Sequence, residues 1–274
     1  MFRKLDRDVE KLAAEQHADI VHSFRTTTRR LQTLLEELVP ERTRKQKKLL
    51  KTLRGIRRQA GKVRDLDAQL AVLRTLQVPL ESRRQTQLLQ GLLELRAKQE
   101  SKLRKTLTKQ VTGNIRKQLK RAAKEIEFKT GRDPLAAAYD ILSRVPLPRG
   151  PLTEDALHRC RILVKRARYA AEYAPESAAS TQFIAQLKRL QDLLGDWHDW
   201  RTLTHTAAER LGSVNESPLA AALRNVTGAK LRYAIAAMAA SPALQTGPKA
   251  VSPAASRKAG AKMARATSPK GAAA

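Results

Sequence analysis

The chain is poor in cysteine, in aromatic residues and in acids, and each shortage excludes a class of protein. Cys160 is the single cysteine, so no internal disulfide can form, and a CxxC pair or a Cys/His zinc cluster is missing. Aromatic residues make up 4% of the chain, which weakens any scheme in which bases stack along a sheet. No apolar run reaches the ~18 residues that span a bilayer, so a membrane-spanning protein is excluded. The opening residues mix charges of both signs without a continuous apolar stretch, which argues against a secretory signal and predicts a cytoplasmic protein.

Positive charge is what the chain has in excess. Its 274 residues include 54 Lys and Arg against 26 Asp and Glu, which gives a formal net charge of +28. So much uncompensated charge favours polyanionic partners, although it says nothing about the fold.

The pattern of apolar residues predicts an all-α fold. Helix formers dominate to about residue 240, and no alternating run of β-branched residues indicates a strand. The expected helices cover residues 10–39, 41–78, 80–128 with a break at Gly113-Asn114, 134–144, 153–174, 180–194, 197–211 and 218–240. The proline-rich residues 145–151 are expected to link two halves, at about 1–145 and 152–240, of one helical domain. Residues 241–274 carry basic residues and no acid among Ala, Pro, Ser and Gly, which predicts a disordered basic tail.

Two motifs occur twice along the chain. Residues 22–30 read H-x-x-R-x-x-x-R-R, and residues 158–166 read H-x-x-R-x-x-x-K-R, at an offset of 136. Residues 53–65 are echoed by residues 187–199 at an offset of 134. Two different motifs in the same order at nearly the same offset predict a duplicated helical bundle with pseudo-twofold halves.

The spacing within each motif gathers cations on one side of a helix. Positions i, i+3 and i+7 share a face. The repeated face consists of His22, Arg25 and Arg29 in the first half, and of His158, Arg161, Lys165 and Arg168 in the second. A further stripe on the second helix is formed by Lys47, Lys51, Arg54, Arg58 and Lys62. Like charges one turn apart destabilise a helix, so such stripes indicate an external counter-charge, and a linear chain of phosphates fits a long positive groove.

Structural explanations compete with this hypothesis. A charged stripe is most often a solvated face, and a single histidine is more often structural than functional, but the repetition makes both explanations weaker. Asp65 and Asp199 are interpreted as partners that orient arginines. Cys160, Trp197 and Trp200 are interpreted as core residues, with Trp/Arg stacking as an alternative for the tryptophans.

Nothing in the sequence points to catalysis. His198 and His205 lie seven residues apart beside Asp199, which makes a metal site geometrically conceivable. No H-E-x-x-H, Walker loop, nucleophile elbow or carboxylate cluster accompanies them. The prediction is a protein without enzymatic activity, metal or cofactor.

Four segments resemble the signature stretches of the CHAD family, the histidine-containing α-helical domains. They are HSFRTTTRRLQTLL, LRGIRRQAGKVRDLDAQLAVL, LHRCRILVKRARYAAEY and LKRLQDLLGDWHDWRTL. The resemblance implies two antiparallel helical bundles around a central basic groove that binds inorganic polyphosphate, in bacteria often at polyphosphate granules. It implies binding by His22, Arg25, Arg29, Lys51, Arg54, Arg58, Arg64, His158, Arg161, Lys165, Arg168 and Lys188.

The sequence departs from the family pattern at three positions. Thr26 stands where valine is frequent, and Gln32 stands where a further arginine is common. His198 replaces the arginine that Arg64 supplies in the first half. The two half-sites are therefore expected to be unequal.

The function that follows is non-catalytic binding of polyphosphate, with the tail adding nonspecific affinity. One alternative is a nucleoid-associated DNA- or RNA-binding protein, because a basic Ala/Lys/Pro tail also suits nucleic acid. A second alternative is an accessory domain that recruits a phosphate-metabolising enzyme. The sequence makes no prediction of oligomeric state.

Overall fold

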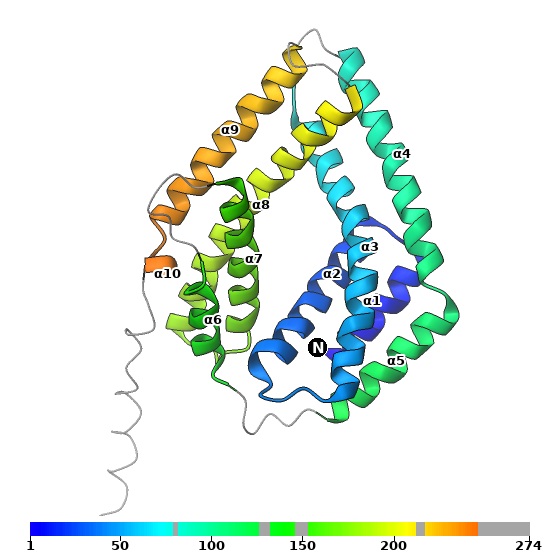
Figure 1. The fold of residues 1–274 in the computed structure, drawn as a ribbon, viewed down its shortest axis with the longest axis vertical. Coiled ribbons are helices and arrows are strands. Elements are labelled where there is room, and N and C mark those ends of the chain that lie inside the picture. Colours follow the sequence, from blue (N-terminus) through cyan, green and yellow to red (C-terminus); the bar gives the residue numbers. More distant parts are fainter. Residues whose placement is uncertain (79–81, 126–131, 146–152, 212–216, 246–274) are drawn as a thin grey trace, which may run out of the picture.

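The protein is all-α, as predicted. Figure 1 shows a computed structural model that describes residues 1–78, 82–125, 132–145, 153–211 and 217–245, and within these ranges every regular element is helical. The elements are α1 (Phe2–Ala14), α2 (Ala18–Thr33), the π-helical turn η1 (Leu34–Leu38), α3 (Arg44–Thr75), α4 (Ser82–Thr106), α5 (Lys109–Lys124), α6 (Pro134–Leu142), α7 (Glu154–Ala171), α8 (Ala178–Leu211), α9 (Pro218–Ala239) and α10 (Pro242–Gln245). No helix within these ranges is both long and apolar enough to cross a membrane.

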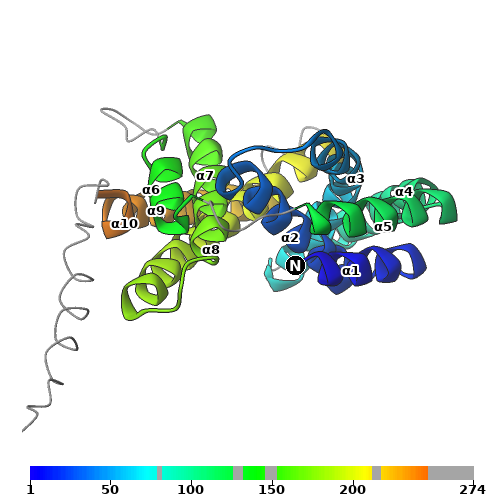
Figure 2. The same ribbon diagram turned by 90° about the horizontal axis from the view of Figure 1, so that it is seen from below.

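The helices pack in the same order in both halves. In the first half α2 packs on α3 and α3 on α4, and in the second α7 packs on α8 and α8 on α9. Viewed from below, α1–α5 lie on one side and α6–α10 on the other (Figure 2). The long hairpins α3–α4 and α8–α9 converge at the top of the molecule (Figure 1). The predicted pair of helical bundles is confirmed, whereas the pseudo-twofold relation between them stays a prediction.

Three clusters of buried apolar side chains hold the bundle together. One belongs mainly to α1, α2, α3 and α5, and another mainly to α6, α7, α8 and α9. The third joins the tips of both hairpins, where Leu66 and Leu73 of α3 share a core with Trp200 and Leu203 of α8. Cys160 and Trp197 lie in the second cluster and Trp200 lies in the third, so the interpretation of all three as core residues is confirmed. The two halves are therefore fastened to each other by hydrophobic burial.

The first predicted helix is wrong in its extent, because the chain bends at residues 15–17. Gln16 interrupts the helix, and its side-chain amide donates to the Leu12 carbonyl oxygen at 2.6 Å. Arg96 of α4 donates to the backbone carbonyl of Gln16 at 2.8 Å, and Arg104 of α4 to its side-chain oxygen at 3.2 Å. Contacts from a distant helix thus satisfy the groups that the break leaves open, which local sequence cannot reveal.

Two other predicted breaks are wrong: one lies elsewhere in the chain, and the other does not exist. The break in residues 80–128 falls before α5 rather than at Gly113-Asn114, because the Thr108 hydroxyl accepts from the Val111 amide and caps the helix. The two helices predicted over 180–194 and 197–211 are one helix, α8, which runs straight through Gly195. A glycine inside a helix costs only about 1 kcal/mol, and burial of Leu194 and Trp197 on either side outweighs it.

The first residues of the predicted tail are ordered. Residues 242–245 form α10, and Ala243 is buried in the second core cluster. Disorder was therefore wrongly predicted for the start of 241–274, where a small apolar side chain finds a packing partner. Residues 246–274, and the linker residues 146–151, lie outside the described residues.

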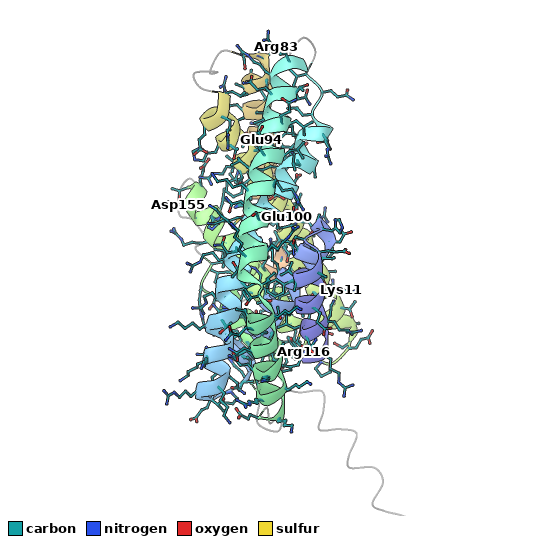
Figure 3. All side chains as sticks on the ribbon, turned by 90° about the vertical axis from the view of Figure 1, so that its right-hand side faces the viewer. Lys11, Arg83, Glu94, Glu100, Arg116 and Asp155 are labelled. Atoms are coloured by element: carbon teal, nitrogen blue, oxygen red, sulfur yellow. The ribbon has the colours of Figure 1, made fainter. Side chains whose placement is uncertain are left out.

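Figure 3 shows the outer face of the first half. α4, which carries Glu94 and Glu100, continues into α5 with Arg116, and α1 with Lys11 lies alongside. Arg116 Nε donates to Asp6 Oδ1 of α1 at 3.1 Å, so an ion pair joins α5 to α1 here.

Candidate functional site

A groove lies between the two halves, and both histidine-bearing helices line it. It has a volume of about 650 Å³ and is walled by α2 and α3 from one half and by α7 and α8 from the other. His22 and Arg25 reach it from α2, and His158 and Arg161 reach it from α7. Each repeated motif therefore presents its cationic face to the same space.

Ten of the twelve residues implied in binding line this groove. They are His22, Arg25, Arg29, Arg54, Arg58, Arg64, His158, Arg161, Lys165 and Arg168. Lys51 and Lys188 lie outside it with exposed side chains, and Lys188 Nζ pairs with Asp192 Oδ2 at 2.6 Å. The structure thus brings the two motifs together and places these two lysines elsewhere on the surface.

Comparison with known proteins settles the family. A family model of the CHAD domain matches residues 1–208, well over half of the chain. The chain belongs to the CHAD family. The crystal structure of the CHAD domain from the plant Ricinus communis is similar to this CHAD domain, with 17% sequence identity and a TM-score of 0.61 over 92% of this chain and 88% of that chain. At that identity the similarity concerns the fold alone. The comparison with curated proteins gave no match. The CHAD family is associated with polyphosphate binding.

The groove of this CHAD domain also contains residues that the sequence analysis did not assign to binding. Arg57 lies three positions after Arg54 and four before Gly61, so helical periodicity could have revealed it. Tyr169 has no such signal, and the Arg168 guanidinium lies 4.6 Å from the centre of its ring. Further lining residues are Thr26, Lys62, Ala68, Gln191, Gly195 and His198, together with the carboxylates Asp65 and Asp199.

The position of Arg25 depends on a glycine. Arg25 Nη1 donates to the Arg57 carbonyl oxygen at 3.3 Å, and its Nη2 lies 3.8 Å from Asp65 Oδ1. A Cβ added at Gly61 would meet Arg25 Nη1 at 2.4 Å, so only glycine leaves room for the guanidinium over α3. In the second half a Cβ at Gly195 would meet nothing within 4 Å. The two half-sites are thus unequal at this point.

Most of the positive charge in the groove is uncompensated. Ten Lys and Arg side chains line it, against two carboxylates. Six of the ten form neither a hydrogen bond nor an ion pair through their side chains with any residue that the structure describes. These six are Arg29, Arg57, Arg58, Lys62, Arg161 and Lys165. The like charges of these side chains repel one another, and a bound anion would relieve that repulsion.

Lys165 is the most strongly perturbed cation of the groove. Burial is the main reason that its pKa falls from 10.5 to about 7, and the nearby charges of Arg161 and Arg29 lower it further. Burial also lowers the pKa of Arg161, which Asp199 partly offsets. The pKa of Arg57 falls to about 10 through burial and the charges of Arg29 and Arg25. These groups are desolvated before any ligand arrives.

The histidines are placed as hydrogen-bonding groups at neutral pH. Burial and the charges of Arg64 and Arg25 lower the pKa of His22, and burial and Arg161 lower the pKa of His158. Arg64 Nε donates to His22 Nδ1 at 3.4 Å, and His22 Nε2 lies 3.5 Å from Thr26 Oγ1. The rings of His158 and His198 stack with their centres 5.5 Å apart. His198, which replaces an arginine, therefore joins the second half-site as a partner of the motif histidine.

A second cavity of this CHAD domain differs in chemistry. It has a volume of about 540 Å³, lies between α8 and α9, and is lined mainly by apolar atoms of residues such as Trp197, Leu219 and Leu231. Such a lining does not suit phosphate. Among the described residues no group of three His, Cys, Asp or Glu is placed to hold a metal ion.

Proposed function

We propose that the chain binds inorganic polyphosphate in the groove between its halves and catalyses no reaction on it. The observation that carries the proposal is the convergence of cations from α2, α3, α7 and α8 on one space, with most of them unpaired. Arginine offers two N–H donors to phosphate oxygens, and lysine acts as a point charge. Partial desolvation strengthens each of these interactions, because the local dielectric constant is lower than in water.

The shape and composition of the groove favour a bare chain of phosphates over nucleic acid. Apart from its histidines, the groove has one aromatic residue, Tyr169, whose face is already occupied by Arg168. Single-stranded nucleic acid binding relies on aromatic surfaces for bases to stack on. A linked series of anions without bases matches a groove whose walls both carry positive charge.

Asp65 and Asp199 are assigned to orientation rather than to proton transfer. Asp65 lies beside Arg25, and Asp199 Oδ1 lies 3.5 Å from His198 Nδ1. Binding alone requires no step from either carboxylate. The same binding would hold the protein at cytoplasmic polyphosphate granules.

A competition assay tests the proposal against nucleic acid. Labelled long-chain polyphosphate bound to the full chain should be displaced by unlabelled polyphosphate but not by duplex DNA at equal phosphate concentration. Binding should also weaken steeply with salt, because each neutralised phosphate releases counterions. Equal displacement by DNA would contradict the proposal and favour a nucleoid-associated protein. Capture of a phosphate-metabolising enzyme without any polyphosphate binding would favour the role of an accessory domain.

Gly61 provides a matched pair of variants. Gly61→Ala should displace the Arg25 guanidinium and weaken polyphosphate binding by roughly tenfold, the effect of disturbing one charge-assisted hydrogen-bonding group. Gly55→Ala, on the same helix but outside the groove, should leave affinity unchanged and raise the free energy of unfolding by up to about 1 kcal/mol, because alanine favours the helix and meets open space. Titration calorimetry and thermal unfolding measure both effects. Equal affinities of the two variants would remove Arg25 from the binding site.

A further inference from the structure

Two of the ion pairs that cross between the halves form a reciprocal pattern, and Arg166 also pairs with Glu37. Arg30 Nε of α2 lies 2.8 Å from Glu172 Oε2 at the end of α7, and Arg166 Nη2 of α7 lies 3.1 Å from Glu36 Oε2 in η1. Arg30 and Arg166 are the last residues of the two repeated motifs and are 136 positions apart. Glu36 and Glu172 are separated by the same 136 positions. An exchange of partners of this kind is what a twofold relation between two halves produces.

Each of these glutamates also holds an arginine of the groove. Glu36 Oε1 accepts from Arg54 Nη2 at 3.3 Å, and Glu172 pairs with Arg168 on its own helix. Arg54 and Arg168 both line the groove. Two cations assigned to polyphosphate are thus already neutralised in the free protein by carboxylates of the same chain.

Glu36 is fixed at the end of the cationic face of α2. Its side chain is 11% exposed, and Gln32 Nε2 donates to Glu36 Oε2 at 2.9 Å. A smaller cavity of about 200 Å³ that contains Glu36 shares Arg29, Arg57 and Lys165 with the groove. The carboxylate therefore adjoins the unpaired cations at the point where α2 passes into a π-helical turn, an element that occurs frequently at functional sites.

We propose that Glu36 and Glu172 are fixed internal anions that end the phosphate-binding run, so that the groove accepts a limited stretch of a polyphosphate chain. The inference rests on the proposed function and adds a determinant of specificity to it. A carboxylate about 3 Å from an arginine occupies donors that a phosphate oxygen would use, and its charge repels the next phosphate in the chain. The glutamates bind no phosphate themselves. They confine the ligand to the unpaired cations around Arg29, Arg161 and Lys165.

The test compares Glu36→Gln with Glu100→Gln on two probes, tripolyphosphate and long-chain polyphosphate. Glu100 is a matched control, since it pairs with Arg96 and Arg104 on α4, away from the groove (Figure 3). Glu36→Gln should raise the affinity for long-chain polyphosphate about fivefold and add about one released counterion to its salt dependence. Tripolyphosphate, which is short enough to stay on the central cations, should bind with unchanged affinity. Glu100→Gln should change neither probe.

The possible outcomes distinguish failure of this inference from failure of polyphosphate binding itself. If the unmodified chain binds neither probe, polyphosphate binding itself fails and this inference fails with it. If the chain binds both probes but Glu36→Gln weakens long-chain binding or leaves it unchanged, the glutamate is a structural link between the halves and the inference is overturned. An equal gain on both probes would also overturn it, as an effect of net charge. Should Glu36→Gln not fold by circular dichroism, Glu172→Gln tests the equivalent contact with the same expected gain.

Discussion

Simultaneous replacement of Arg25 and Arg161 by glutamate is expected to weaken polyphosphate binding by about 100-fold or more. The two arginines occupy equivalent positions in the repeated motifs and face the same groove from α2 and α7. Burial lowers the pKa of each, which marks them as desolvated charges whose interactions with a ligand are strong. Loss of one buried charge in an interface costs about 2–5 kcal/mol, so two reversals exceed two decades in the dissociation constant.

The control pair changes the net charge by the same amount as the double replacement in the groove. Lys117→Glu with Lys120→Glu alters two exposed cations of α5 that do not line the groove. We expect this pair to reduce affinity by less than about fivefold, through the general field alone. Removal of residues 246–274 should have a similarly small effect and spares the buried part of α10. If the truncation matched the loss in the groove variant, the tail would be the binding element. If the charge reversals prevent folding, the milder pair Arg25→Gln and Arg161→Gln can replace them. It should also lose more affinity than the control pair or the truncated chain.

Polyphosphate affinity is expected to fall as pH rises through neutrality. Lys165 has a pKa of about 7 in the empty groove, and a bound anion favours its charged form, so binding takes up a proton above that pH. The groups that face Lys165 are Arg161 on its own helix, Arg25 and Arg29 from α2, and Asp199 from α8. Between about pH 6.5 and 8.5 the affinity should drop roughly tenfold. A profile that stays flat over this interval would show that Lys165 does not meet the ligand.

Two variants of Lys165 isolate its contribution to that profile. Lys165→Arg remains charged throughout and should bind with little dependence on pH above 7. Lys165→Met should bind weakly at every pH. The stability of the protein without ligand should change with pH in the opposite direction to its affinity. A lysine whose pKa is lowered by folding opposes folding while it is charged. The free energy of unfolding should therefore rise as pH climbs from about 7 toward 10.5, and Lys165→Met should remove that rise.

Helical periodicity correctly predicted which residues share a helix face, but it predicted the breaks between helices poorly. Residues that are three and seven positions apart on a helix share a face. His22, Arg25 and Arg29 therefore line the groove together, and this does not depend on where the helix begins or ends. The bend at Gln16 depends on arginines of α4 some eighty residues away, and no local pattern encodes it. Breaks were wrongly predicted at Gly113 and Gly195, because the helix penalty of a single glycine is small and both helices continue through it.

Two residues that were assigned to binding lie outside the groove, and one groove arginine was not assigned. Lys51 follows the same stripe as Arg54 and Arg58, but its side chain is exposed one turn beyond the end of the groove lining. Lys188 was assigned through its equivalence to the first half, yet Asp192 one turn later holds its ammonium group. Arg57 was missed because the stripe was traced through Arg54, Arg58 and Lys62, and Arg57 lies one position to the side of it. Equivalence between repeats predicts helix faces, whereas the partners on each face differ from one half to the other.

The shared core at the tips of the two hairpins has a consequence for synthesis of the chain. When the first half leaves the ribosome, Leu66, Leu73 and their neighbours on α4 have only one another to pack against, because Trp200 and Leu203 are made later. The first wall of the groove, formed by α2 and α3, is then open to other polyanions of the cell, RNA among them. The second wall is formed by α7 and α8, so the complete groove exists only after these helices have been made and have docked. A prematurely terminated product would expose both an apolar surface and a basic surface.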